Sequence, residues 1–364
     1  MTEPYLIAEN DLPAKYISLH TTDRNAFRCC RRRWNFQSAL KQNLTMKEKL
    51  SLNLWFGTGF HFALEDYHGY NRFGNPAKAL KAYVDCFSKE ELTLDCQALV
   101  DIGYEMINHY VNEWLPRRNI YKTLIIDGVP QVEVESSIYI PELSEAFGIP
   151  VIYQLKYDRV VTDPDGRFWI QDHKTAASFN ISKLETDPQV SAYCWAFPYI
   201  YGQTSAGMLY SQYKKAIVEE PRILKNGNIS TDKTQNTTYE RYLKALKERY
   251  GNITFPPKNK EVLDILLEQE TPESDAFIRW DRVARNEHNN ESEYLKILAE
   301  GYEMLNPKLA IYPNPTSDCS WSCNFYNVCL AQDDGSDWEF MINEDFEIRK
   351  HEEEIWRSKI QYPQ

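Results

Sequence analysis

The sequence lacks the motifs of membrane-spanning, secreted and ATP-driven motor proteins. It has no apolar run near the roughly 20 residues that a bilayer-spanning helix needs, so we expect no membrane partner. The opening residues MTEPYLIAENDLPAKY carry early acids and no apolar segment, so we expect no secretory signal and a cytoplasmic location. Since there is no Gly-rich phosphate loop, no ATP-driven motor is expected in this chain.

Positive charge is also scarce. The 364 residues include 41 lysines and arginines against 53 acids, a net charge of −12, although 43% apolar residues suffice for a packed core. This balance argues on its face against a nucleic-acid partner. The acids are concentrated between Asp333 and Glu354, which we expect to be a solvated helix or tail. A basic cluster with nearby aromatics lies at Arg24–Arg33.

The apolar periodicity changes along the chain from helical to alternating. We expect mostly helix over residues 1–50, a loop at Phe56–Gly59 with Thr58 as an N-cap, and a helix from Phe60 to Tyr70. The other expected elements are helices over 76–116, strands from Gln131 and over 151–161, 167–174 and 207–217, a helix that begins at Asp187-Pro188, and partly helical structure over 220–300.

The most informative segment is a predicted hairpin. Asp163-Pro164-Asp165-Gly166 suits a type I turn followed by a left-handed glycine. Counting outward from this loop places Asp158 opposite Asp172, with Cβ atoms about 5 Å apart. Lys174 is two residues further along and points to the same face. Opposed carboxylates repel each other unless a cation lies between them.

This arrangement indicates metal chemistry. Asp158, Asp172 and the His173 backbone carbonyl could hold Mg²⁺ or Mn²⁺ in an oxygen-rich site. Lys174 could orient or deprotonate an attacking water, and a metal on a scissile phosphate supplies Lewis acidity. We therefore expect phosphodiester hydrolysis. The alternative is a solvated sheet face with an ordinary Lys–Asp pair, which apolar residues on both faces disfavour.

The cysteines suggest a second site. Cys319, Cys323 and Cys329 form a C-x3-C-x5-C pattern in a turn-rich loop, which suits a metal or cluster site. The other cysteine-dense position is Cys29-Cys30, so a site with four cysteines would join the two ends of the chain. On these residues, both zinc and an iron–sulfur cluster are chemically open.

Asp158 and Asp172-His173-Lys174 together resemble the PD-(D/E)XK nuclease superfamily. Gly57-Thr58-Gly59-Phe60-His61 resembles the G-T-x-x-H motif of its RecB-like nucleases, which implies a metal-ligand role for His61. Gln189-Val190-Ser191-Ala192-Tyr193 resembles their Q-x-x-x-Y motif, which implies substrate contacts by Gln189 and Tyr193. The order of these motifs along the chain looks most like that of stand-alone RecB-like nucleases carried by bacteriophages.

Cys30-Arg31-Arg32-Arg33-Trp34 resembles the C-x-R-x-W pattern of the iron–sulfur branch, typified by CRISPR-associated RecB-like exonucleases. This resemblance implies a [4Fe–4S] cluster held by Cys30, Cys319, Cys323 and Cys329, with Zn²⁺ as the alternative at these cysteines.

The resemblance also implies the fold. It is α/β (α+β), a PD-(D/E)XK core with a mixed central sheet flanked by helices, and a helical region formed by both termini and stapled by the cluster. The expected parts are an N-terminal helical segment (1–54), the nuclease core (55–217), a mostly helical support region (218–305), the cysteine-rich loop (306–332) and an acidic segment (333–364).

The implied function is a Mg²⁺- or Mn²⁺-dependent DNA exonuclease, a deoxyribonuclease acting on single strands or duplex ends. Its expected setting is phage or bacterial DNA recombination, repair or processing, in the host cytoplasm if phage-encoded, with a helicase or recombination protein as candidate partner. One alternative is a non-catalytic DNA-binding adaptor, which need not retain His61, Asp158, Asp172 and Lys174 together. The other is a structure-specific endonuclease of the same superfamily, which the cysteine set and Q-x-x-x-Y disfavour.

Three neighbouring residues have two interpretations each. Glu135 could be an outer carboxylate of the site or a solvent-facing strand residue. Glu65, one turn after His61, could orient that histidine or be an exposed helix residue. His68 could join the same stripe, although an ordinary surface histidine is expected.

Overall fold

The structure, a computed structural model, describes residues 3–47, 51–88, 91–182, 184–251, 254–350 and 352–363. Its central sheet consists of β1 (Tyr5–Ile7), β2 (Ile17–Leu19), β4 (Lys122–Thr123), β7 (Val132–Tyr139), β8 (Val151–Thr162), β9 (Phe168–Ala176), β10 (Gly207–Lys214) and β11 (Ile278–Ala284). Two small ribbons are β3 (Leu44–Met46) with β12 (Phe346–Ile348), and β5 (Ile125–Ile126) with β6 (Val129–Pro130).

The α-helices are α1 (Thr21–Cys29), α2 (Arg31–Gln37), α3 (Leu52–His68), α4 (Pro76–Val84), α5 (Leu94–Asn108), α6 (Leu115–Arg118), α7 (Pro141–Phe147), α8 (Pro188–Tyr201), α9 (Tyr239–Tyr250), α10 (Pro257–Leu267), α11 (Glu287–Leu305), α12 (Cys319–Ser322), α13 (Tyr326–Asp334), α14 (Trp338–Asp345) and α15 (Glu352–Arg357). The 3₁₀ turns are η1 (Glu9–Asp11) and η3 (Leu184–Thr186), and η2 (His109–Trp114) is a π-helical turn. No helix of the described residues is long and apolar enough to cross a membrane.

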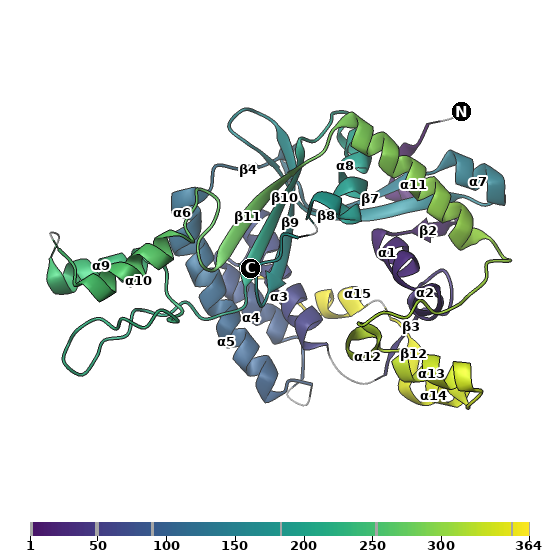
Figure 1. Cartoon of the computed structure of the whole chain (residues 1–364). Helices are drawn as coiled ribbons and strands as arrows, with labels where there is room; N and C mark the ends of the chain where they lie inside the picture. Colours follow the sequence, from purple (N-terminus) through teal and green to yellow (C-terminus); the bar gives the residue numbers. More distant parts are fainter. Residues whose placement is uncertain are drawn as a thin grey trace.

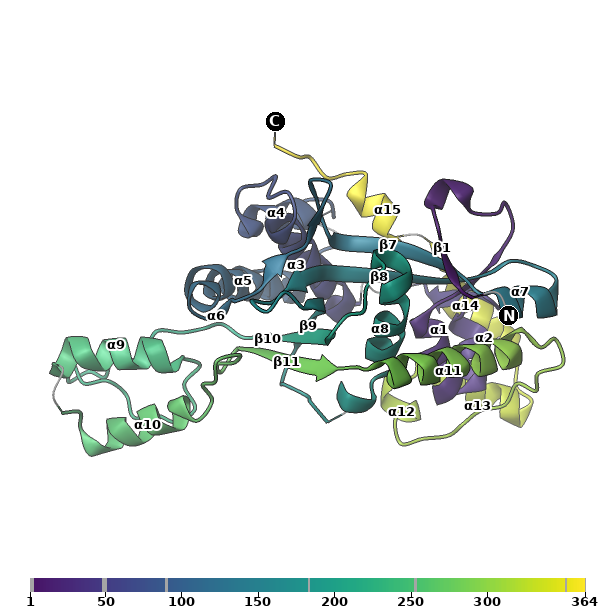
Figure 2. The same ribbon diagram turned by 90° about the horizontal axis from the view of Figure 1, so that it is seen from above.

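The sheet is mixed, as expected. Its strands follow the order β1-β7-β8-β9-β10-β11, and β2 and β4 pair with β8. Most neighbours are antiparallel, whereas β9 with β10 and β2 with β8 are parallel. Figure 1 shows the strands at the centre, and Figure 2 shows α3 to α5 on one side of the sheet with α8 and α11 on the other. The predicted mixed sheet flanked by helices is therefore confirmed.

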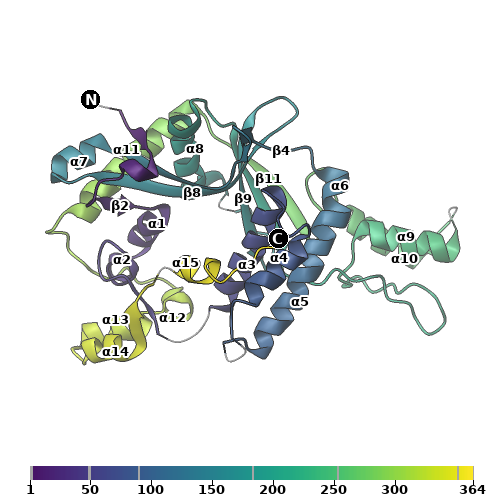
Figure 3. The ribbon, with the colours of Figure 1, turned by 180° about the vertical axis from the view of Figure 1, so that it is seen from behind.

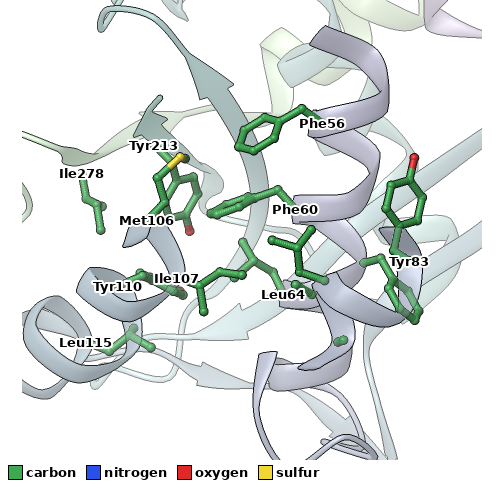
Figure 4. Packing of buried hydrophobic residues seen from close by; sticks show 14 of the residues in the cluster. Phe56, Phe60, Leu64, Tyr83, Met106, Ile107, Tyr110, Leu115, Tyr213 and Ile278 are labelled. Carbon is green, nitrogen blue, oxygen red and sulfur yellow. The ribbon is translucent and has the colours of Figure 1, made fainter. Parts of the chain in front are cut away.

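Each face of the sheet has its own apolar core. Phe60 of α3 packs against Tyr213 of β10, with ring centroids 5.1 Å apart, and Figure 4 shows Tyr110 and Ile278 around them. On the other face the core includes Trp195 of α8. Because both faces are covered, polar side chains at the centre of the sheet are removed from water, which raises the cost of any unpaired charge there.

The two ends of the chain pack together. Phe36 of α2 stacks on Phe325, with ring centroids 5.1 Å apart, and β3 pairs with β12. Figure 3 shows α2 beside α12 to α14, far from the arm that α9 and α10 form at the opposite end. The arm has a small apolar core of its own around Tyr242 and Leu246. The stretch from Asp333 to Glu354, expected to be a solvated helix or tail, therefore includes packed elements such as buried Phe346. Trp356, just beyond it, is buried in the main core.

The predicted loop at Phe56–Gly59 is wrong, because α3 runs through it. The Thr58 hydroxyl donates to the Leu54 carbonyl one turn earlier, at 2.9 Å, and is not an N-cap. A Cβ added at Gly59 would lie 2.5 Å from Cδ1 of Tyr83. The glycine therefore permits close packing of two helices rather than a turn.

Two further expectations need correction. Residues 1–50 were expected to be mostly helical, but the described part also contains β1, β2 and β3. The stretch 220–300 contains β11, which pairs with β10 along its whole length. These short strands are stabilised by partners distant in sequence, which local periodicity does not reveal.

The basic cluster is used for packing rather than left open. Arg24 is fully buried, and its guanidinium pairs with Glu293 at 2.8 Å and with Glu300 at 2.6 Å, both on α11. Arg28 pairs with the same Glu300, and Arg32 pairs with Asp333. These ion pairs fix the N-terminal helices against α11 and the C-terminal region.

We predict that Arg24→Met lowers the free energy of unfolding by about 3–5 kcal/mol, because it leaves buried Glu293 without its main counter-charge. Arg28→Met is the matched control, since Arg28 is partly exposed, and its loss should cost about 1 kcal/mol or less. Urea denaturation of both variants measures the difference. Equal losses would mean that burial of the Arg24 pair does not matter.

Candidate active site

The β8–β9 hairpin has the register counted from its turn. The side chain of Asp163 accepts the backbone N–H groups of Asp165 and Arg167, both at 3.0 Å, and Gly166 has a left-handed φ of 79°. The strands then pair from Thr162↔Phe168 to Arg159↔Gln171. One further step places Asp158 opposite Asp172.

At that step the Asp158 side chain accepts a hydrogen bond from the backbone of β9. Oδ2 of Asp158 accepts the backbone N–H of His173 at 2.7 Å. Burial, together with repulsion from Asp172, raises the pKa of Asp158 to about 7. The two carboxylates are thus close enough to affect each other's charge, as the sequence predicted.

Asp172 is almost completely buried, with 1% of the residue exposed. Its Oδ1 accepts from Nζ of Lys174 at 2.9 Å and from Nε2 of Gln189 at 3.2 Å. Its Oδ2 is buried and has no hydrogen-bond partner among the described residues. A buried carboxylate oxygen without a partner is costly, and a bound cation would satisfy it.

Lys174 is held as a cation by the same carboxylates. Burial opposes its charged form, but the charges of Asp172 and Asp158 outweigh burial, so the pKa of Lys174 lies above its ordinary value. In this arrangement the ammonium group can orient a ligand or neutralise negative charge.

His61 approaches the carboxylates from α3. Its Nδ1 lies 3.5 Å from Oδ2 of Asp158, and its ring contacts the backbone of His173. Burial and the positive charge of Lys174 lower the pKa of His61, which favours the neutral imidazole that binds metals. The continuous helix α3 therefore delivers His61 to the two aspartates.

Glu133 of β7 is the site residue that sequence reasoning missed. Glu133, His61 and Asp158 each offer a ligand atom, and the three atoms lie within 4.8 Å of one another. Burial and the charge of Asp158 raise the pKa of Glu133 to about 7, while Lys156 pairs with it at 2.8 Å. These residues could hold a divalent cation, which would relieve the repulsion.

The choice between Glu133 and Glu135 depends on the backbone. Glu135, the carboxylate that the sequence offered, has a side chain that is 74% exposed. Glu133 has a left-handed φ of 52°, which is uncommon for a residue other than glycine and marks a locally strained strand. In the alternating Val132-Glu133-Val134-Glu135 pattern nothing distinguishes the two glutamates.

The helix α8 brings the two predicted substrate residues to the same site. Its N-cap is Asp187, whose side chain accepts the backbone N–H of Gln189 at 2.7 Å, as the Asp-Pro start predicted. Gln189 contacts Asp172, and burial with the nearby charge of Asp172 raises the pKa of Tyr193. Both side chains therefore lie beside the carboxylates.

Three nearby residues point elsewhere. The His173 ring lies on the opposite face, where Nδ1 is 2.9 Å from the hydroxyl of Tyr213. His68 stacks on His173 with ring centroids 6.1 Å apart, so it is not the surface histidine that was expected. Glu65 pairs with Arg357 at 2.7 Å rather than with His61.

The four predicted cluster cysteines line one cavity of about 160 Å³ between the two ends of the chain, and Cys29 lines it too. The Cys30 sulfur accepts the backbone N–H groups of Arg33 at 3.5 Å and Asn314 at 3.4 Å. The Cys319 sulfur accepts the backbone N–H of Thr316 at 3.4 Å. Burial raises the pKa of the Cys323 thiol, and the nearby Cys30 and Cys319 add to this effect. Cys329 lies beside the Arg32 guanidinium at 3.3 Å.

A mixed sheet between helices, with acids and a lysine on adjacent strands, is the arrangement of a hydrolase that acts on nucleic acids. The model of the PD-(D/E)XK nuclease superfamily matches residues 21–330, and the chain belongs to this superfamily. Its members use divalent metals. Among curated proteins, none matches the chain.

We predict that Glu133→Gln weakens Mn²⁺ binding at least tenfold, about 1.4 kcal/mol, because it removes one charged ligand. Glu135→Gln should leave Mn²⁺ binding unchanged, although Glu135 also faces Lys156, at 3.5 Å. Isothermal titration of the two variants against the parent chain measures both affinities. If the two variants lose affinity equally, Glu133 contributes only to the general negative potential.

Proposed function

We propose that the chain is a divalent-metal-dependent DNA exonuclease of the RecB-like type. The observation that carries the proposal is Oδ2 of buried Asp172, which has no hydrogen-bond partner in the described part of the chain. It lies beside Asp158, and Lys174 contacts the other oxygen. A sheet centre gains no stability from such a group of like charges. Binding of a metal and a phosphodiester by these residues would explain why the like charges are placed together.

The positions of the residues suggest a separate role for each in catalysis. Asp158, Asp172, His61 and Glu133, with the His173 carbonyl, would hold Mg²⁺ or Mn²⁺, and the bound metal would supply Lewis acidity and a more acidic water. Lys174 donates to Asp172 and would stabilise the negative charge that develops on the phosphate. Gln189 keeps Asp172 oriented and, with Tyr193, contacts the strand next to the scissile bond.

Two features favour an exonuclease over the alternatives. An adaptor would not need a metal site and a paired lysine at the same time, and both are retained. The Q-x-x-x-Y helix and the cysteine set favour the RecB-like exonucleases over endonucleases of the superfamily. Roles in phage or bacterial recombination, repair or processing, and a helicase partner, stay predictions.

We further propose a structural [4Fe–4S] cluster at Cys30, Cys319, Cys323 and Cys329. The shared cavity and the N–H groups aimed at sulfur support a site for thiolates. Among the described residues no three cysteine sulfurs lie within 4.8 Å of one another. In a zinc site with Zn–S bonds of about 2.3 Å, tetrahedral geometry would bring the sulfurs to about 3.8 Å. The resemblance of Cys30-Arg31-Arg32-Arg33-Trp34 to the iron–sulfur branch favours the cluster over zinc.

We predict that the protein degrades end-labelled linear DNA with Mn²⁺ and leaves closed circular DNA intact. Asp172→Asn and Lys174→Ala should each lower the rate about a hundredfold or more, because each removes a group that stabilises the transition state. Asp165→Asn, in the exposed hairpin loop, is the matched control and should keep full activity. Full activity in both site variants would refute the nuclease assignment, and cleavage of circular DNA would refute the exonuclease.

The anaerobically purified protein should be brown and contain iron and sulfide. Cys30→Ser should lose the colour and melt at a lower temperature, because the cluster joins the two ends of the chain. Cys29→Ser should keep both properties, although it is the adjacent residue. A colourless protein with one zinc per chain would refute the cluster without affecting the nuclease proposal.

A further inference from the structure

A groove of about 750 Å³ opens beside the candidate active site. One wall is the N-terminal segment from Leu6 to Tyr16, which loops out from the sheet between β1 and β2 (Figure 2). The strands β7 and β8 contribute Val134 to Ser137 and Gln154 to Lys156, and α8 contributes Gln189 and Tyr193. The groove thus lies between segments from four parts of the chain.

The groove is continuous with the site of the proposed chemistry. Gln189 lines it and also donates to Asp172 at 3.2 Å. Tyr193, one helical turn after Gln189 on α8, lines it as well. A ligand in the groove would therefore lie next to a phosphodiester held at the carboxylates.

The charges of the groove do not suit a phosphate backbone. Lys156 is the one lysine or arginine among the described residues that line it, and Glu9 and Glu135 line it too. A surface that follows a nucleic-acid backbone needs several cations, because each phosphate carries a negative charge. The scissile phosphate therefore has its place at the metal site, and the groove suits an uncharged part of the substrate.

Neutral polar groups in the groove are held in place by one another. Nε2 of His20 lies 2.8 Å from the hydroxyl of Ser18, which donates to Gln154. Nε2 of Gln154 in turn lies 3.3 Å from the hydroxyl of Ser137. Tyr16, Tyr193 and Leu12 add aromatic and apolar surface. Fixed polar atoms beside flat apolar surface are what a nucleobase requires, with its polar edge and its stacking face.

We propose that this groove binds unpaired nucleobases next to the scissile phosphate, and thereby selects a single strand. The inference rests on the proposed function. In a duplex the base edges are paired and the faces stacked, so only an unpaired strand can offer both to the groove. Tyr16 supplies a stacking surface, and Asn25 in the middle of α1 offers an amide to a base edge.

The test is fluorescence anisotropy with the full chain, in EDTA so that no strand is hydrolysed. The probes are a labelled oligothymidylate, the same strand with abasic sites, and a duplex of equal length. The normal strand should bind at least about tenfold more tightly than either of the others, since stacking on an aromatic ring contributes about 1–3 kcal/mol per base.

Matched variants locate the effect. Tyr16→Ala should weaken binding of the strand about tenfold, and Tyr16→Phe should restore it, because the ring and not the hydroxyl provides the stacking surface. Tyr5→Ala is the control, since Tyr5 belongs to the same N-terminal segment but lies outside the groove lining. Asn25→Ala should also weaken binding. Because Asn25 is exposed, this substitution should leave the stability of the fold unchanged.

Equal affinity for normal and abasic strands, or equal losses in Tyr5→Ala and Tyr16→Ala, would overturn the groove proposal. If Tyr16→Ala changes neither cleavage nor binding, the groove proposal is overturned and the nuclease proposal is unaffected. Binding that depends on Tyr16 in a protein that cleaves no DNA supports the groove and refutes the nuclease.

Discussion

Repulsion between carboxylates in a covered sheet centre is the constraint on which the site depends. Asp158 and Asp172 face each other across a hairpin, and Glu133 lies on the neighbouring strand. Burial removes the water that would weaken their repulsion. Lys174 balances part of the charge, yet Oδ2 of Asp172 stays without a partner among the described residues. The fold therefore leaves these carboxylates with excess negative charge, which a bound cation would neutralise.

The same balance of charge explains how an acidic chain can act on nucleic acid. The helix α11 supplies acids that neutralise Arg24 and Arg28, so the basic cluster holds the ends of the chain together and does not serve as an open patch. Under the proposed function, phosphate recognition then depends on the metal site and Lys174. Affinity for DNA without metal should be modest, and a groove that contacts uncharged bases is compatible with a net charge of −12.

Local patterns predicted some parts of the site well. The turn at Asp163–Gly166 determines the register of the hairpin, and alternation then places Asp158, Asp172 and Lys174, because each step depends only on near neighbours. The start of α8 at Asp187 follows from a cap that is also local. Patterns that depend on packing were less informative. Two glycines near Thr58 resemble a loop, but contact with another helix decides in favour of continuous helix.

The sequence by itself determined the superfamily, the mixed sheet and the aspartates and lysine of the hairpin, since spacing along a strand translates directly into position. Only the tertiary structure decided that Glu133 rather than Glu135 reaches His61, because the pairing of β7 with β8 places Glu133 beside Asp158 and Glu135 opposite Lys156. It also decided that Cys30 and three cysteines almost 300 residues later line one cavity, and that an N-terminal segment forms a groove wall. These features depend on contacts between distant segments, which no local pattern encodes.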